Sequence, residues 1–452
     1  MSFESEPSNT GWFRFALAGA GVLVLAAVWA VWSLLLAPPV VLEEAVVADA
    51  GKVSGRDSEG LAEEGAGGGG KRVRKAVKAA PLRLSARIGL EELRGALVGE
   101  GAVPGEALLV FRSAAELAAF RARAGLYGVK ILGSDARLNS ARVKYDSLGR
   151  LADELNEHPG SYENVAANLV ARIPGLPRST PEVDMANQGG ESAFLEGVMG
   201  SIGAGGDRSD WGAGVKVAVL DSGVKDHETF EGVSIEHVKL VESEPEANGH
   251  GTSMASLIAG QEEPATGVAQ GAKLLDVWVA DEKGMSNTGL VAEGIMAAVD
   301  RGAKVINISL GSFGSSLVLQ NAVQYAMNQG VVIVAAAGNE QLTQLAYPAA
   351  YPGVVSVGAV DKQRKQASFS NSGQGLVLSA PGVGILSAYP NGEVVVGSGT
   401  SQATALVSGA VATLMGRGLS GAEAVKLLRE SATATGAPKE QVGAGVLRIP
   451  GR

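Results

Sequence analysis

The chain has 452 residues, of which 46% are hydrophobic and 19% charged, which excludes a disordered polyelectrolyte and allows a large core. It has no cysteine and only four histidines, which excludes disulfides, thiolate zinc sites and a cysteine nucleophile and leaves little room for a multi-histidine metal centre. The net charge of -9 disfavours nonspecific binding to nucleic acid, so we expect no nucleic-acid partner.

The N-terminal region contains one long apolar run. Residues 1–14 form a short tail, and residues 15–37 are 23 residues without a charge, which is long enough to cross a bilayer. A cleaved signal peptide or a buried core helix is the alternative, but a signal would have a shorter apolar core and a basic leader, whereas Glu4 and Glu6 precede this run. We expect a single-pass anchor that leaves the rest of the chain on the noncytoplasmic side, in the periplasm or outside the cell.

A flexible linker and a small domain follow the apolar run. Residues 38–80 lack a hydrophobic period and include four consecutive glycines, which predicts a flexible, glycine-rich linker. Residues 81–180 read as a small α+β domain of ferredoxin-like order, with strands at 107–111, 141–145 and 165–173 and helices at 114–124 and 148–157. Residues 71–180 are net basic and residues 187–452 net acidic, which favours docking between the two.

Residues 187–452 read as a larger α/β domain. Its strands include 215–220, 273–280, 304–309 and 331–336, and helices at 289–301 and 317–328 occupy the connections. The strands are nearly continuous runs of Val, Ile and Ala, which is typical of strands buried on both faces. The pattern predicts a mainly parallel sheet covered by helices on both sides.

Three short segments of this domain carry reactive side chains. Asp221 ends a buried strand in Asp-Ser-Gly, His250 begins a helix in His-Gly-Thr, and Ser401 begins another in Gly-Thr-Ser-Gln-Ala. Each residue alone could be a turn or helix cap. Together they supply the nucleophile, base and orienting carboxylate that acyl transfer needs.

These segments, in the order Asp, His, Ser, resemble those of the subtilisin-like serine proteases. The resemblance covers about residues 211–449 and extends to the intervening blocks 308–311, 335–339, 347–348, 368–371 and 380–382. It implies a subtilisin-like α/β fold in which Ser401 is the nucleophile, His250 the general base and Asp221 its orienting carboxylate. Asn339 matches the asparagine that binds the oxyanion in that family.

The resemblance also implies substrate-binding residues. Two stretches of the family pair with substrate backbone as added strands, and small residues wall the first side-chain pocket. The corresponding positions here are Ser309, Leu310, Gly311, Gly284, Ser286, Ala336 and Gly338. The matching blocks contain no acidic residue that would select Lys or Arg, so we expect a pocket for a medium or large apolar side chain.

Two departures from the family pattern stand out. Gln402 directly follows Ser401, at a position where the family usually has Met. Ala405 occupies the position where the family usually has proline. The stretch 260–267 lacks the longer calcium-binding loop of secreted members, and Glu262 and Glu263 alone supply too few oxygens for a hard cation. We expect no metal and no cofactor.

The small domain resembles the inhibitory propeptide of these proteases. We therefore expect a membrane-anchored serine endopeptidase, made as a precursor that cuts itself between Pro174 and Glu191 and keeps its own prodomain as an inhibitor. A noncatalytic binding protein on the same fold is the first alternative. A peptide ligase that uses the same residues is the second.

Overall fold

The computed structural model of the chain describes residues 82–84, 87–173, 194, 197–242 and 248–451. The expected tail, anchor and linker lie outside these residues, as does most of the joint between residues 173 and 194. Over the described ranges, no helix combines the length and apolar composition that a membrane crossing requires. Two domains can be described, an N-terminal α+β domain (residues 82–173) and an α/β domain (residues 197–451).

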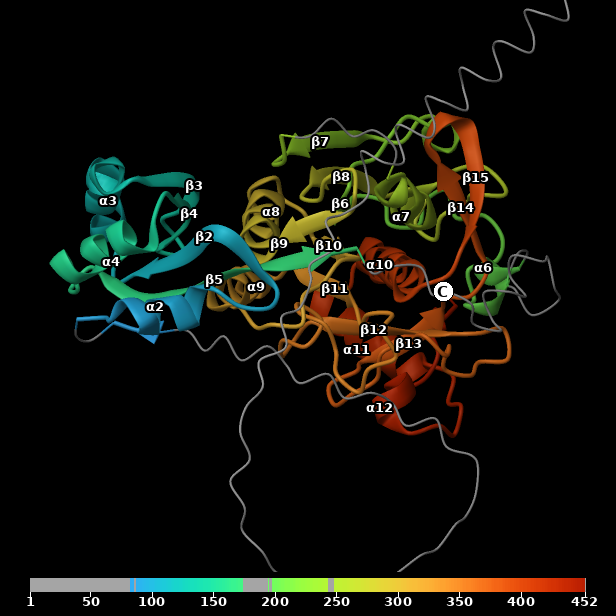
Figure 1. The fold of residues 1–452 in the computed structure, drawn as a ribbon. Coiled ribbons are helices and arrows are strands. Elements are labelled where there is room, and N and C mark those ends of the chain that lie inside the picture. The colour runs from blue at the N-terminus through green and yellow to red at the C-terminus, as the bar shows by residue number, and fades with distance from the viewer. Residues whose placement is uncertain (1–81, 85–86, 174–193, 195–196, 243–247, 452) are drawn as a thin grey trace, which may run out of the picture. The chain divides into compact units, whose positions relative to one another are not determined.

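The N-terminal domain is an antiparallel sheet with helices packed on it (Figure 1). Its strands run in the order β1-β5-β2-β4-β3. In chain order the elements are β1 (Leu82–Arg83), α2 (Leu90–Leu97), β2 (Ala102–Phe111), α3 (Ala114–Arg123), a 3-10 turn (Ala124–Tyr127), β3 (Val129–Asp135), β4 (Ser140–Tyr145), α4 (Leu148–Glu157) and β5 (Tyr162–Arg172). The expected strand–helix order is confirmed, and α2 and β3 are additions to the elements predicted.

This domain has its own apolar core. Phe111, Phe120 and Tyr162 are buried, with ring centroids 5.0–6.2 Å apart, and aliphatic side chains of α2, α3 and α4 complete the cluster. Such aromatic contacts add to the stabilisation from buried area alone. The domain therefore holds its shape through its own side chains.

The α/β domain is built on a seven-stranded sheet in which all neighbouring strands are parallel. The strand order is β13-β12-β11-β10-β6-β8-β7. The strands are β6 (Lys216–Asp221), β7 (Ile235–Lys239), β8 (Lys273–Trp278), β10 (Val305–Ile308), β11 (Val332–Ala336), β12 (Val355–Val360) and β13 (Leu378–Pro381). The predicted parallel sheet is thus confirmed, with strand ends shifted by one or two residues.

Helices cover both faces of this sheet. The chain continues through α6 (Val198–Ser201), α7 (His250–Ala259), β9 (Met285–Asn287), α8 (Thr288–Asp300), α9 (Leu317–Asn328), the hairpin β14 (Ile385–Tyr389) and β15 (Glu393–Gly397), α10 (Thr400–Gly416), α11 (Gly421–Ser431) and α12 (Lys439–Val442), with 3-10 turns at Glu228–Phe230 and Pro390–Gly392. Along β6, Val217 and Val219 join the apolar cluster of α7 and α10, whereas Ala218 and Leu220 join that of α8 and α9. A strand buried on both faces explains its unbroken apolar sequence.

A polar cluster lies at the β7–β8 edge of the sheet. Asp276 is fully buried on β8, and its carboxylate accepts hydrogen bonds from the Trp278 indole and, at 2.9 Å, from His237 Nδ1 on β7. This hydrogen bond to Asp276 raises the pKa of His237 above its usual range. Trp278 in turn occupies the space beside Gly223, two residues after Asp221.

The His237–Asp276 pair predicts a pH-dependent contribution to stability. Because folding raises the pKa of His237, the contribution is complete below the unfolded value of 6.5 and is lost as the pH rises through the folded value. His237→Gln, made in an inactive Ser401→Ala background to prevent autolysis, should lower the unfolding temperature by about 1–2 °C at pH ~5.5, as expected for a half-exposed ion pair. The same substitution should have a smaller effect at pH ~9. Equal shifts at the two pH values would contradict this assignment.

Candidate active site

The predicted reactive residues gather at the carboxyl edge of the parallel sheet. Asp221 is the last residue of β6, Ser309 follows β10, and Asn339 comes three residues after β11. Helices α7 and α10, which pack against each other, begin at the same edge with His250 and with Thr400-Ser401. Because all strands run in one direction, residues far apart in the sequence converge there.

Asp221 and His250 form a direct pair. The carboxylate of Asp221 is fully buried, and each of its oxygens lies 2.9 Å from His250 Nδ1. The backbone N–H and the hydroxyl of Ser222 also donate to Asp221 Oδ1, at 2.8 and 3.2 Å. A carboxylate partner requires the proton on Nδ1, so the other ring nitrogen, Nε2, is left as the acceptor that a general base needs.

The start of α7 is shaped for this pair. Gly249 precedes His250 with a φ of 53°, and a Cβ placed there would lie 2.2 Å from the ring of Tyr389. A side chain at position 249 would therefore meet both backbone strain and the hairpin β14–β15. Glycine allows Tyr389 of the hairpin to pack directly against the backbone before His250.

Ser401 lies in the first turn of α10 and is 2% exposed. Its Oγ donates a 3.4 Å hydrogen bond to the carbonyl of Ser309, and the Ser309 hydroxyl donates back to the Ser401 carbonyl at 3.5 Å. The two serines thereby join the start of α10 to the end of β10. Transfer of the Ser401 proton to His250 belongs to the mechanism proposed below.

Two N–H groups face the space beside Gly399. Asn339 Oδ1 accepts from the backbone N and the Oγ1 of Thr400, at 3.0 and 2.8 Å, which turns Asn339 Nδ2 the other way. A Cβ placed on Gly399 would lie 2.8 Å from Gln402 Oε1, 3.0 Å from this Nδ2 and 3.6 Å from the Ser401 backbone N. A substrate oxygen that develops negative charge in this space would meet both donors.

The predicted backbone-binding residues hold the end of β5. Figure 1 shows β5 running from the N-terminal domain to the side of β9, with which it pairs antiparallel. Ser286 lies opposite Ala171, Gly284 O accepts from Ile173 N at 2.9 Å, and Gly311 exchanges two 2.9 Å hydrogen bonds with Arg172. The strand is therefore paired along both of its edges by residues that sequence analysis assigned to substrate binding.

Glu340, which sequence analysis did not single out, lies beside Gly338. Ala336 and Leu310 are buried, and the Glu340 carboxylate lies so that its Oε2 would be 2.7 Å from a Cβ on Gly338. Asn371 Nδ2 donates to the same oxygen at 2.9 Å. The position of Glu340 directly after Asn339 was the available signal.

Gln402 departs from the family pattern in its packing as well. It is 5% exposed, its amide lies against Gly397 and Gly399, and its Oε1 has no hydrogen-bond partner. A buried amide oxygen without a donor destabilises the fold relative to a methionine of similar length. Gln402 thus places a polar amide against residues 397–399, the segment directly before α10.

The remaining histidines lie outside this centre. His227 donates from Nε2 to the Glu393 carbonyl at 3.1 Å and accepts at Nδ1 from Thr229 N at 3.0 Å, so it ties the hairpin to the body of the domain. His158 packs beside Glu154 in the N-terminal domain. Among the described residues, no cluster of His, Asp or Glu has the arrangement of a metal site.

Comparison with known proteins finds proteases that are similar to residues in the α/β domain. Residues 212–445 match the Subtilase family of peptidases. Subtilisin Savinase of Lederbergia lenta is 41% identical over 209 residues, which are 44% of this chain and 76% of that protein. A thermostable alkaline protease of Halalkalibacterium halodurans is 40% identical over 216 residues, or 47% of this chain, and the match spans only 59% of that relative's length.

Solved structures agree on the fold. Fervidolysin of Fervidobacterium pennivorans, a keratinolytic enzyme, superposes with a TM-score of 0.66 at 24% identity, over 78% of this chain and 61% of that one. The protease domain of PatA is 33% identical with a TM-score of 0.50, over 56% of this chain and 95% of that one. The family match covers more than half of the chain and includes Asp221, His250, Asn339 and Ser401, and the chain therefore belongs to the subtilase family.

Proposed function

We propose that this chain is a serine endopeptidase that is made as a self-inhibited, membrane-anchored precursor. The main support for the catalytic part is the buried Asp221–His250 pair, at the sheet edge where Ser401 lies in the first turn of α10. No cofactor is needed for peptide hydrolysis by these groups.

The proposed reaction proceeds in two steps. His250 Nε2 takes the proton of Ser401 as Oγ bonds to the carbonyl carbon of the peptide, and the oxygen becomes negative between Asn339 Nδ2 and the Ser401 N–H. His250 then gives that proton to the departing amine, which leaves an acyl-serine. Water, deprotonated by the same imidazole, releases the acid and regenerates Ser401, while Asp221 stays ionised throughout.

A covalent probe tests the nucleophile. A fluorophosphonate should label the self-processed wild-type protein, and Ser401→Ala should abolish the labelling. Ser408→Ala is the matched control, because this serine lies on the same helix and donates to Asn307 Oδ1 at 3.0 Å, within the core. Equal labelling of wild type and Ser401→Ala would overturn the assignment. An unlabelled wild type would favour the noncatalytic alternative, and coupling of the acyl group to an added amine would favour the ligase.

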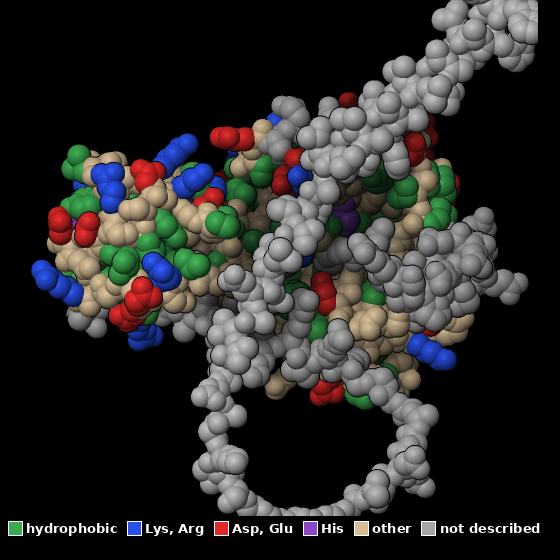
Figure 2. Space-filling view, in the orientation of Figure 1, with side chains coloured by type: hydrophobic (Ala, Val, Ile, Leu, Met, Phe, Trp, Pro, Cys, Tyr) green, Lys and Arg blue, Asp and Glu red, His purple; other side chains and the backbone are tan. Residues whose placement is uncertain are grey.

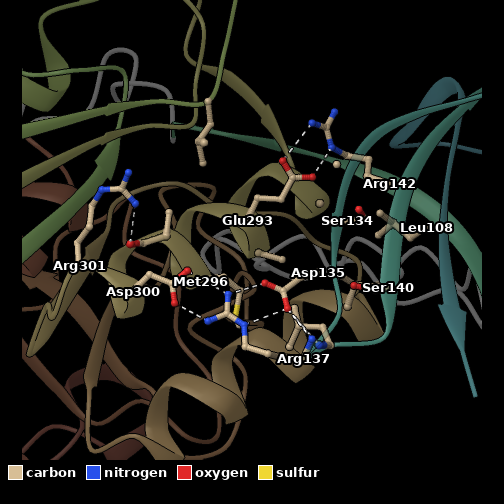
Figure 3. A pocket seen from close by; sticks show the side chains of 17 residues that line it. Leu108, Ser134, Asp135, Arg137, Ser140, Arg142, Glu293, Met296, Asp300 and Arg301 are labelled. Atoms are coloured by element: carbon tan, nitrogen blue, oxygen red, sulfur yellow. Dashed lines mark hydrogen bonds and ion pairs between the residues drawn. The ribbon is translucent and has the colours of Figure 1, made fainter. Parts of the chain in front are cut away.

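The N-terminal domain is proposed to act as the inhibitory prodomain. Its strand β5 lies between β9 and Gly311, where a substrate backbone would pair. Two ion pairs, one from β4 and one from the β3–β4 turn, connect the domain to α8. Figure 3 shows Arg142 against Glu293, with nitrogen–oxygen distances of 2.9 and 3.3 Å, and Arg137 between Asp135 and Asp300. These pairs border a cavity of about 300 Å³ between the domains.

These specific pairs, rather than a uniform basic face, support the docking expected from the charge balance. Figure 2 shows basic and acidic side chains interspersed over the visible face of the N-terminal domain. Arg142 is only 12% exposed in its side chain, so its attraction to Glu293 is less screened than that of a surface pair. The proposed self-cleavage site between Pro174 and Glu191 falls outside the described residues.

Removing the Arg142–Glu293 ion pair should speed release of the proposed prodomain. After self-cleavage, Arg142→Ala should weaken inhibition about tenfold, because it leaves the partly buried Glu293 without its partner. Arg150→Ala is the matched control, since Arg150 bonds Leu126 O inside its own domain. Hydrolysis of a fluorogenic peptide at about 0.05 M and 0.5 M salt measures the release, which should be faster at the higher salt. Unchanged inhibition in Arg142→Ala, or cleavage of Ser401→Ala at the same joint, would contradict this role.

The membrane anchor is proposed from the uncharged run at residues 15–37, and Glu4 and Glu6 before it disfavour the basic leader of a signal peptide. The unprocessed Ser401→Ala precursor should stay in the membrane fraction after an alkaline carbonate wash, and protease added from the noncytoplasmic side should digest it. Deletion of residues 15–37 should release it. A wild-type precursor that begins near Gly51 would show a cleaved signal peptide instead.

A further inference from the structure

The amide of Gln402 shares the space beside Gly399 with the two proposed oxyanion donors. The point where a Cβ on Gly399 would lie is 2.8 Å from Gln402 Oε1 and 3.0 Å from Asn339 Nδ2. The backbone N of Ser401 is 3.6 Å from the same point. A substrate oxygen that enters this space therefore meets three polar groups, two of which are donors and one of which is an acceptor.

Nothing in its surroundings fixes the orientation of the Gln402 amide. Its Oε1 is buried and has no hydrogen-bond partner among the described residues. The amide lies between two glycines, because a Cβ on Gly397 would collide with Nε2 and a Cβ on Gly399 would crowd Oε1. A half-turn about the Cγ–Cδ bond therefore meets no side chain at positions 397 and 399 and breaks no hydrogen bond of Oε1.

Asn339 differs from Gln402 in this respect. Its Oδ1 accepts hydrogen bonds from the backbone N and the Oγ1 of Thr400, at 3.0 and 2.8 Å, so its Nδ2 is oriented before substrate arrives. A buried amide oxygen without a donor, as in Gln402, is costly and therefore uncommon in folded proteins. An unpaired acceptor that faces the space of a reacting oxygen points to a role in the reaction.

The charge that develops during catalysis gives the amide a reason to turn. As Ser401 Oγ bonds to the carbonyl carbon, the π electron pair of the C=O bond moves onto the carbonyl oxygen. Gln402 Oε1 would repel that oxygen, because both atoms carry negative charge. After a half-turn, Nε2 occupies the position of Oε1 and donates an N–H to the same oxygen. This hydrogen bond strengthens only as the charge forms, so it accelerates the reaction rather than tightening the binding of substrate.

We propose that Gln402 is a catalytic residue, a third oxyanion donor that turns its amide toward the substrate oxygen as negative charge develops there. The proposal rests on the proposed function, because the oxyanion arises only if Ser401 is the nucleophile. It assigns a role to a residue at which this chain departs from the family pattern.

Gln402→Met tests the donor, since it removes the N–H and keeps a side chain of similar length. Wild-type and variant chains are incubated until self-processing is complete, and active sites are counted with a fluorophosphonate. The kcat for a fluorogenic peptide should fall about tenfold, with KM within about twofold of the wild-type value. The loss is smaller than the ~100-fold or more expected for a donor that is already oriented, because Gln402 must first turn.

A pair of inhibitors separates oxyanion binding from general binding. A peptide trifluoromethyl ketone forms an adduct with Ser401 that carries the oxyanion, whereas the corresponding alcohol cannot form an adduct. Gln402→Met should weaken the ketone about tenfold and leave the affinity for the alcohol as in wild type. Gln261→Met is the matched control, because Gln261 lies just beyond the C-terminal end of α7 and its Nε2 donates to Ala259 O and Gln270 O.

Stability should change in the opposite direction to activity. In a Ser401→Ala background, Gln402→Met should raise the unfolding temperature by about 2–4 °C, because it removes a buried oxygen without a donor. A merely structural role would instead lower both the unfolding temperature and kcat. Gln402→Glu keeps the shape of the side chain but presents only oxygens to the oxyanion, so kcat at pH ~8 should fall about a hundredfold.

Four results would contradict the proposal. Wild-type kcat in Gln402→Met or in Gln402→Glu, or equal weakening of the ketone and the alcohol, overturns it while the proposed function stands on the labelled wild type. A lower unfolding temperature of Gln402→Met also overturns it. A wild-type protein that neither reacts with the fluorophosphonate nor cleaves the peptide overturns both the proposal and the proposed function.

Discussion

A carboxylate buried at the end of a central strand is the constraint on which this active centre depends. Asp221 is fully buried, and a charge in that position must be paired and hydrogen-bonded. The donors come from Ser222, directly after the strand, and from His250, at the start of a helix 29 residues further on. Satisfying Asp221 therefore positions α7 against β6 and fixes the proton on one nitrogen of the imidazole.

The other half of the candidate site, around Ser401 and Asn339, is also held by a few hydrogen bonds. Thr400 donates twice to Asn339, which orients the proposed oxyanion donor, while its neighbour Ser401 is the proposed nucleophile and the proposed second donor. Ser309 then joins the start of α10 to the sheet. Because each group is held by the backbone of a packed strand or helix, little rearrangement is needed when substrate enters.

Strand addition would connect the proposed catalysis with the proposed inhibition. The backbone at β9 and at Gly311 pairs with β5 here, and a substrate segment in extended form would complete the same two edges in its place. β5 does so as part of a domain with its own core, which presents the segment already extended and so reduces the entropy lost on binding. The ion pairs of Arg137 and Arg142 with α8 add a contact outside the cleft that an ordinary substrate lacks.

Sequence alone determined the class of fold and was sufficient to propose the reactive residues. Strands buried in a parallel sheet have continuous apolar sequences, which can be recognised without a structure. Asp221, His250, Asn339 and Ser401 lie in short motifs whose neighbouring glycines and hydroxyl residues can also be recognised in the sequence. The strand β3, the turn of Glu340 onto Gly338 and the His237–Asp276 pair were not predicted, and only the tertiary structure decided them. Each depends on side chains brought together from separate elements, and such contacts leave no period or spacing in the chain because the residues that make them are neighbours only after folding.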